Sequence, residues 1–594
     1  MKVQRLSLYC LSRTPGHGRL SNSMMHQAGI RRLLLFVALF RSVVLFASAL
    51  PATPLETKPS ASTQTEPAAP FPAAPFKEAE DYFRKGSFDQ AIAKYNEVLK
   101  SGTQSAEAYT GIVRCYLRQD KARDAAETLE KGLQAKPSDP GLKVVQGELL
   151  FRQGRIAEAE KIFVQLINGG QAPARAFLGL ANISSAVAMY AREHRLIVRA
   201  HELDPSDQDI QKEWMSTLSR ADRIKFLETY LAQPTGDAAD TRRGLSEYLE
   251  ILKARQAAPP GACRLVSDVT ATETELLQLL SDPFHLRGMG LPVTINSQKS
   301  KLLLDTGAGG ITINRKLAAR AGVQRMAGVR IGGVGDKGDA QGYAAYADSI
   351  RIGNLEFRNC PVDVIEKRSV GDEEGLIGAD VFGKFLIEID FPNHKLKLTQ
   401  LPARPGEPQV KPSLATDEGE DESTSESDPK PAGSAANGAN PAPAPKYFDR
   451  YIGPEMNSYA RVFRFGHMLL VPTKINDVPG KLFLIDSGAF SNTITPDAAR
   501  EVTKVHGDYD TRVKGLSGEV AKVYEAKTVV LEFGALRQKN EEMVAFDLSH
   551  ISRDVGTEVS GTLGFPMLNL LKIKLDYRDA LVNFEYVPDP RRGY

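Results

Sequence analysis

Cysteine is scarce in this chain, and its scarcity excludes one class of fold. The 594 residues contain only four cysteines, and none of them stands in a Cys-x-x-Cys pair or another zinc-like cluster. A scaffold stapled by several disulfides is therefore excluded, and no metal site or cofactor is expected. Cys10 falls in an N-terminal segment that we interpret below as a leader. We expect the other three to be unpaired: Cys115, Cys263 and Cys360.

An excess of charge of either sign is also lacking. Lysine and arginine total 75 and aspartate and glutamate total 73, so the net charge is +2, which argues against nucleic acid as a partner. Hydrophobic residues make up 42% and charged residues 25%, as in ordinary globular proteins, so most of the chain can bury a core. At roughly 100 to 200 residues per domain, the length predicts three or four domains.

The N-terminal segment has no apolar run long enough to span a membrane. The run Leu33–Phe40 has eight residues and Arg41 ends it, whereas a spanning helix needs roughly 20. Two arginines precede the run, and Ala47–Ala49 offers a small-x-small cleavage site. These features predict that residues 1–49 are an export signal peptide, with an uncleaved membrane anchor as the alternative. The protein is then periplasmic, secreted or signal-anchored at the membrane.

A helical repeat follows. Three alanines recur at intervals of 34 residues: Ala91, Ala125 and Ala159. Apolar residues at helical spacing fill each interval, and Gly86 and Gly154 stand at turns between helices. This pattern resembles the tetratricopeptide repeat, whose helix pairs stack because no single pair can bury its own apolar face. We expect residues 77–254 to form such a solenoid, which either binds a protein partner or substrate or serves as a spacer.

Two segments have a composition that cannot form a core. Residues 50–76 are rich in proline, alanine and threonine, and residues 401–446 contain nine prolines and no aromatic residue. We predict that the first is a disordered tether and the second a disordered linker.

The segments on either side of the linker resemble each other. An apolar strand leads into Asp305-Thr306-Gly307-Ala308 before the linker and into Asp486-Ser487-Gly488-Ala489 after it. A second motif follows at a similar distance in both, Leu376-Ile377-Gly378 and Thr562-Leu563-Gly564, although Thr562 stands where a hydrophobic residue is expected. Asp390 and Asp576 also recur, each beside a turn, where a structural hydrogen bond is expected. Two copies of one all-β unit therefore occupy residues 285–400 and 460–588.

These motifs resemble the aspartic protease family, and the short unit resembles its retroviral (retropepsin-like) type. The resemblance implies that Asp305 and Asp486 form a catalytic pair. Supporting roles fall to six neighbours: Thr306, Gly307, Ser487, Gly488, Gly378 and Gly564. The hydroxyls would hydrogen-bond across the pair, the next glycines would allow the tight turn, and the last two would pack beneath it. Flaps that cover the cleft are expected to contain four glycines: Gly333, Gly335, Gly515 and Gly518.

The implied chemistry explains why two copies are needed. Hydrolysis of a peptide bond by water needs a base and an acid, and two carboxyls that share one proton supply both. The overall prediction is a multidomain protein: an all-α tetratricopeptide-like solenoid, then two all-β retropepsin-like domains that form an exported aspartic endopeptidase. The alternative function is a catalytically inactive peptide-binding or assembly module. The aspartates could pair within one chain, as a monomer with an internal pseudo-dimer, or between the chains of a homodimer.

Overall fold

The computed structural model describes most of the chain. The described residues are 6–10, 73–102, 105–170, 172–233, 237, 239–257, 263–282, 285–366, 373–407, 411–414 and 447–588. The predicted signal peptide and tether lie outside these ranges, apart from residues 6–10 and 73–76. Within the described ranges, no helix is both long and apolar enough to cross a membrane.

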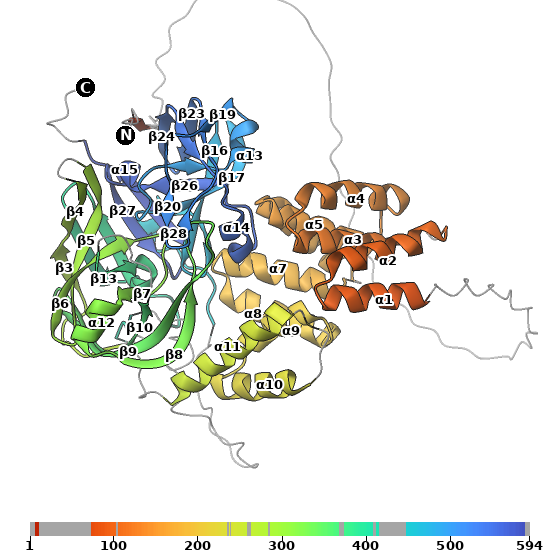
Figure 1. Ribbon diagram of the computed structural model, residues 1–594, viewed down its shortest axis with the longest axis horizontal. Coiled ribbons are helices and arrows are strands. Elements are labelled where there is room, and N and C mark those ends of the chain that lie inside the picture. The colour runs from red at the N-terminus through yellow and green to blue at the C-terminus, as the bar shows by residue number, and fades with distance from the viewer. Residues whose placement is uncertain are drawn as a thin grey trace, which may run out of the picture. The chain divides into compact units, whose positions relative to one another are not determined.

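Helices fill the described residues between 73 and 257 (Figure 1). Their bounds are α1 (Ala73–Arg84), α2 (Phe88–Lys100), α3 (Ala106–Arg118), α4 (Ala122–Ala135), α5 (Pro140–Arg152), α6 (Ile156–Asn168), α7 (Ala174–Ala186), α8 (Tyr190–Leu203), α9 (Gln208–Ser216), α10 (Arg220–Ala232) and α11 (Ala239–Gln256). Ser105 and Asp139 cap α3 and α5 by accepting hydrogen bonds from Ala108 and Leu142 amides. Gly86 and Gly154 adopt positive φ in the turns. The helical part of the predicted fold class is confirmed.

The repeating alanines explain why these helices pack in pairs. Ala91, Ala125 and Ala159 are completely buried, so the small side chain stands where two helices approach closely. The aromatic ring of Phe163 fills the space between helices, and a Cβ on Gly147 would lie 2.6 Å from it. The array is therefore held by large side chains set against small ones.

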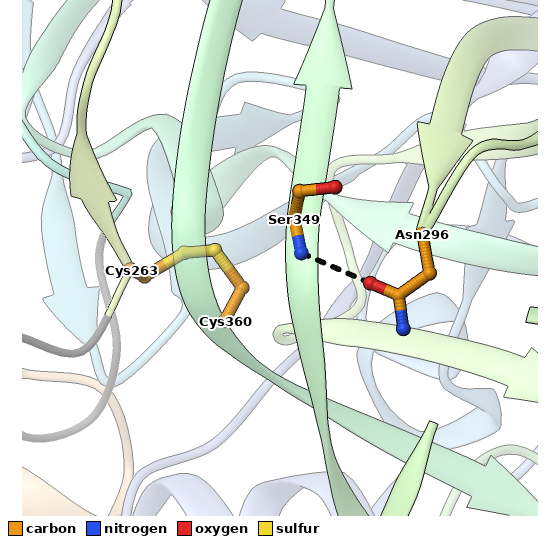
Figure 2. Close-up of a disulfide and its surroundings, with 4 residues drawn as sticks. All are labelled: Cys263, Asn296, Ser349 and Cys360. Atoms are coloured by element: carbon orange, nitrogen blue, oxygen red, sulfur yellow. Dashed lines mark hydrogen bonds between the residues drawn. A yellow bond between two sulfur atoms is a disulfide. The ribbon is translucent and has the colours of Figure 1, made fainter. Parts of the chain in front are cut away.

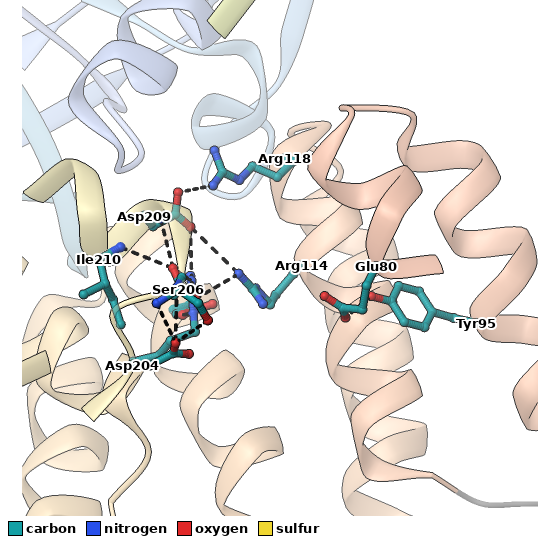
Figure 3. A network of polar contacts seen from close by, with 11 residues as sticks. Glu80, Tyr95, Arg114, Arg118, Asp204, Ser206, Asp209 and Ile210 are labelled. Atoms are coloured by element: carbon teal, nitrogen blue, oxygen red, sulfur yellow. Dashed lines mark hydrogen bonds and ion pairs between the residues drawn. The ribbon is translucent and has the colours of Figure 1, made fainter. Parts of the chain in front are cut away.

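An ion network joins distant helices of this array. Arg118 of α3 forms an ion pair with Asp209 at the start of α9, and Arg114 lies 3.9 Å from the same carboxylate (Figure 3). Arg175 of α7 bridges Asp207 and Asp209, at 2.8 and 3.1 Å. These charged side chains are thus neutralised by partners within the array.

The first β unit follows the helices. Its elements are β2 (Arg264–Leu265), β3 (Thr272–Glu275), β4 (Leu277–Asp282), β5 (His285–Ile295), β6 (Gln298–Asp305), β7 (Ile311–Asn314), α12 (Arg315–Ala321), β8 (Gln324–Ile331), β9 (Ala340–Ile352), β10 (Leu355–Ile365), β11 (Gly375–Gly378), η1 (Ala379–Phe382), β12 (Phe385–Asp390) and β13 (Lys395–Gln400). One sheet has the order β2-β10-β7-β11-β6-β5-β9-β8, and β4 pairs with β5. Three strands thus precede residue 285, so the unit begins earlier than the sequence boundary.

The second β unit repeats this plan after the linker. Its elements are η3 (Pro454–Met456), β14 (Ala460–Arg461), β15 (Phe463–Phe465), β16 (Met468–Ile475), β17 (Val478–Asp486), β18 (Thr493–Ile494), α13 (Pro496–Arg500), β19 (Val505–Asp508), β20 (Lys514–Gly515), β21 (Gly518–Glu519), β22 (Val523–Ala526), β23 (Val529–Phe533), β24 (Leu536–Asn540), β25 (Met543–Ala545), α14 (Ser549–Val555), β26 (Gly561–Gly564), α15 (Phe565–Leu568), β27 (Leu571–Asp576) and β28 (Leu581–Tyr586). Its main sheet runs β1-β24-β23-β16-β17-β26-β18-β25-β22-β19, where β1 is Leu6–Cys10.

A shared sheet joins the two units within one chain. Its strand order is β14-β28-β27-β12-β13-β3, so strands from both units hydrogen-bond to one another. The joint lies between β12 and β27, where Ile389 is opposite Ile573 and Ile387 is opposite Leu575. All four side chains are fully buried. The sheet therefore fixes the two halves against each other through both backbone hydrogen bonds and core packing.

The expectation that Cys263 and Cys360 are unpaired is wrong, because they form a disulfide (Figure 2). They are 97 residues apart in sequence, but β2 pairs with β10 and brings their Cα atoms to 4.2 Å. The same figure shows the Asn296 side chain accepting a hydrogen bond from the Ser349 amide, at 2.9 Å, which anchors the β5–β6 hairpin. Cys115 is free and buried, as expected.

The expectation of a disordered linker over residues 401–446 is wrong for its described parts, 401–407 and 411–414. Arg404 is buried and forms an ion pair of 2.5 Å with the fully buried Asp579 of the second unit. Leu414 is also buried, and Ser413 forms a β-bridge with Arg264. Charge and one apolar side chain hold these residues, although their composition is unlike that of a core. Residues 408–410 and 415–446 lie outside the described residues.

Candidate active site

The two aspartates stand at the carboxyl ends of matching strands. Asp305 ends β6, which runs parallel to β11 with Gly378 beside Asp305. Asp486 ends β17, which runs parallel to β26 with Gly564 beside Asp486. A Cβ on Gly378 or Gly564 would meet the backbone of the facing loop, so only glycine fits at either place.

Hydrogen bonds cross from one copy to the other directly beneath the aspartates. The Thr306 hydroxyl donates to the Ile485 carbonyl at 2.9 Å, and the Ser487 hydroxyl donates to the Leu304 carbonyl at 2.8 Å. Each hydroxyl also accepts the backbone N–H of the other residue, at 2.9 and 3.0 Å. Both side chains are buried, so the four bonds are shielded from water and fix the two active-site loops in register.

The same loops bring the two carboxyl groups together. The Gly307 amide donates to Asp305 at 2.9 Å, and the Gly488 amide donates to Asp486 at 3.0 Å. A Cβ on Gly307 would lie 2.6 Å from the Asp486 carboxyl carbon, and one on Gly488 would overlap the Asp305 carboxyl. The glycines therefore leave the space in which each carboxyl group reaches the other copy.

Burial and mutual repulsion shift the titration of this pair. Burial raises the pKa of the Asp305 carboxyl, although backbone N–H groups from Gly307 and Ala308 oppose the rise. Burial and the neighbouring charge of Asp305 raise the pKa of Asp486 to about 8. The pair therefore releases its last proton at a higher pH than a free aspartate does.

The glycine-rich hairpins of the two copies meet each other. The Ser517 amide donates to the Val334 carbonyl at 2.9 Å, and the Lys337 amide donates to the Ser517 carbonyl at 2.6 Å. Gly335 has a φ of 130°, and a Cβ there would lie 2.5 Å from the Gly518 nitrogen. A Cβ on Gly333 would lie 2.8 Å from the Leu516 side chain, and a Cβ on Gly515 would overlap the Val334 carbonyl oxygen. All four predicted flap glycines thus lie near the contact between the two copies.

The aspartates and the hairpins line one cavity of about 1880 Å³. Sequence reasoning missed several other residues of its wall. His467 lies at the β15–β16 turn, with Nδ1 2.8 Å from the Cβ position of Gly309. Helix α14 contributes His550, and the helical array contributes Tyr190 and Glu193. No local motif marks these residues, because the wall combines segments far apart in the sequence.

Comparison with known families agrees with this geometry. Residues 291–381 and 471–567 each match the aspartyl protease family, and residues 76–140 match the tetratricopeptide repeat. The two β units are aspartyl protease domains. No curated protein matches the chain. The matched protease segments begin within β5 and β16 and include both aspartates, so the family match covers the strands and loops that form the site.

The recurring aspartates at the ends of β12 and β27 have structural roles in these domains. The Asn393 amide donates to Asp390 at 3.1 Å, and the Asp579 amide donates to Asp576 at 3.0 Å. Each bond closes the turn that leads into the last strand of its domain. Burial and the nearby charge of Asp579 raise the pKa of Asp576 to about 7.

Proposed function

We propose that the protein is an aspartic endopeptidase whose single catalytic dyad is formed by Asp305 and Asp486. The observation that carries this proposal is the meeting of the two carboxyls above four buried cross-copy hydrogen bonds. A purely structural domain needs neither buried aspartate, because an unneeded buried carboxyl costs free energy.

The proposed reaction uses the shared proton of the dyad. The ionised carboxylate of Asp305 takes a proton from water, and the oxygen of that water attacks the carbonyl carbon of the peptide bond. Asp486, whose pKa is raised to about 8, donates its proton to the carbonyl oxygen. On collapse of the tetrahedral intermediate the C–N bond breaks, the proton held by Asp305 passes to the leaving amine, and one hydroxyl of the intermediate returns a proton to Asp486. The products are a new carboxyl group and a new amino group.

The hairpins supply the substrate-binding part of the proposal. Their residues line the cavity that contains the dyad, so an extended peptide bound there could form strand-like hydrogen bonds with the hairpin backbones. The two tips bond to each other through Val334 and Ser517, so they must separate to admit a chain and then close over it. We therefore propose extended polypeptide segments as the substrates, with protein partners or substrates recruited by the helical array.

We also propose export, because the predicted leader and the disulfide are consistent with it. A disulfide such as Cys263–Cys360 persists in oxidising compartments and is rare where thiols are kept reduced. The mature protein would then work outside the cytosol, whether free or anchored by its leader.

The test of the proposed function is cleavage of a peptide library by the mature protein across a range of pH. Wild type should cleave, and Asp305→Asn should reduce cleavage by at least about a thousandfold, since the remaining groups cannot activate water. A transition-state mimic of peptide hydrolysis should inhibit wild type. A wild-type protein that binds peptides but cleaves none at any pH would instead identify the inactive binding module. Unchanged cleavage by Asp305→Asn would also refute the proposal.

A further inference from the structure

The helical array shares a hydrophobic core with the second protease domain. Phe163 and Leu180, from α6 and α7, belong to the same buried cluster as Leu482 and Leu484 of β17. Leu484 stands two residues before Asp486. Gly154, in the turn between α5 and α6, is close enough to Leu482 that a Cβ there would lie 3.5 Å away. The strand that ends in Asp486 therefore packs directly against the array.

Polar contacts fix this packing at one turn of the array. The Arg152 side chain donates to the Ser552 carbonyl of α14 at 2.9 Å, and its carbonyl accepts the Glu558 amide at 2.9 Å. The Thr557 hydroxyl donates to the Phe151 carbonyl at 2.5 Å. The Phe151 ring also lies edge-on to Phe465, at 6.2 Å between centroids. This turn therefore contacts both α14 and the β15–β16 hairpin. His550 of α14 lines the cavity.

The two protease domains differ in this respect. Leu303 stands two residues before Asp305, the place that matches Leu484. Among the described residues, its buried cluster comes entirely from the protease domains and contains no member of the array. The matching strands of the duplication thus differ at this position: Leu484 of β17 shares its buried cluster with the helices, and Leu303 of β6 does not.

We propose that the second protease domain is itself a partner of the helical array, and that Phe151 and Arg152 are positioning residues for Asp486. This inference rests on the proposed function and extends it, because the array then acts on catalysis as well as on recruitment. Packing of Leu482 and Leu484 against the helices fixes the position of β17 relative to the array. Bonds from Arg152 to α14 set the adjoining cavity wall.

A short peptide separates positioning from recruitment, because a substrate of about six residues that fills the cleft has no segment left to bind elsewhere on the array. We expect Arg152→Ala to lower kcat for this peptide by about tenfold, since small displacements of a catalytic group are costly. KM should change by less than about twofold. Arg152→Lys, which keeps the charge, should recover part of kcat. The matched control is Arg123→Ala, on the exposed surface of α4.

Hydrogen exchange gives a readout that does not need activity. In Arg152→Ala, the backbone amides of residues 482–486 should exchange faster, whereas those of residues 301–305 in the first copy should keep their wild-type rates. If wild type cleaves the peptide and Arg152→Ala has the same kcat and the same exchange at β17, the inference is wrong. If wild type cleaves nothing, the proposed function fails, and exchange at β17 alone decides the inference. Equal acceleration in both strands would indicate general destabilisation and would also overturn it.

Discussion

At the scale of single residues, the site depends on two carboxyls with unequal surroundings. Asp486 accepts hydrogen bonds from the Gly488 and Ala489 amides, which lower its pKa. Its pKa is nevertheless raised to about 8, because burial and the charge of Asp305 outweigh those bonds. A raised pKa means that the folded protein retains the proton to higher pH than a free carboxyl does. Asp486 is therefore the carboxyl that we expect to hold a proton below about pH 8.

The pH dependence of kcat/KM should follow from this arrangement. Activity should fall as the pH rises through about 8, because Asp486 then loses the proton that it must donate. It should also fall on acidification once Asp305 is protonated, at a pH above the ordinary value of an aspartate because its pKa is raised. A pH profile with a short peptide measures both limbs. An activity that keeps rising above pH 9 would contradict the shared proton.

Gly307 gives a second test at this scale. Gly307→Ala places a methyl group 2.6 Å from the Asp486 carboxyl carbon, so the two carboxyls must separate. We expect kcat to fall by about a hundredfold or more, since misplacement of about 1 Å has effects of that size. Gly244→Ala in α11, where the added Cβ meets open space, is the control and should retain full activity. The measurement is the kcat for peptide cleavage by the two variants, compared at equal folded fraction. Equal kcat values for the two variants would contradict the prediction.

At the scale of elements, the disulfide ties β2 to β10 and closes a loop of about 100 residues. Removing a native disulfide typically costs 2 to 5 kcal/mol, and long loops lie toward the upper end. We expect the double variant Cys263→Ser with Cys360→Ser to lower the free energy of unfolding by about 4 kcal/mol in urea titration. A reducing agent should destabilise wild type and leave the double variant unchanged. If the reductant affects neither protein, the disulfide does not form in solution.

The ion pair between Arg404 and Asp579 holds the linker's first residues to the second domain. Asp579 is fully buried and also accepts the Tyr451 amide at 2.7 Å. Arg404→Ala leaves the Asp579 carboxylate with one ion-pair partner, Arg578 at 2.9 Å. We therefore expect a cost of about 3 kcal/mol, the lower end of the range for breaking a buried pair. Arg351→Ala removes an exposed ion pair with Glu356 and should cost less than about 1 kcal/mol. Urea unfolding of both variants measures the difference, and equal effects would contradict the account.

Local patterns in the sequence predicted much of this architecture. The 34-residue interval predicted the helical array, and the repeated Asp-Thr/Ser-Gly motifs predicted two β units with their aspartates at strand ends. Contacts between distant segments could not be predicted in this way. Cys263 meets Cys360 only because β2 pairs with β10, and Arg152 meets Ser552 across 400 residues. Composition also misled at Arg404, because a proline-rich segment can be held by one buried ion pair.

At the scale of the whole molecule, one chain supplies both halves of the site. The shared sheet joins β12 to β27, and the cross-copy bonds of Thr306 and Ser487 join the two loops that carry the aspartates. The array packs against the second domain through β17, and the disulfide links β2 to β10 in the first domain. We therefore expect a single chain to form a complete enzyme with one dyad.

Mixing two inactive variants distinguishes a dyad formed within one chain from a dyad formed between two chains. Asp305→Asn and Asp486→Asn should each be inactive alone and should remain inactive when mixed in equal amounts, because every chain then has one defective dyad. Titration of wild type with a transition-state mimic should give one site per chain. Recovery of activity on mixing, to about a quarter or more of wild type, would contradict the account and show that the dyad forms between chains.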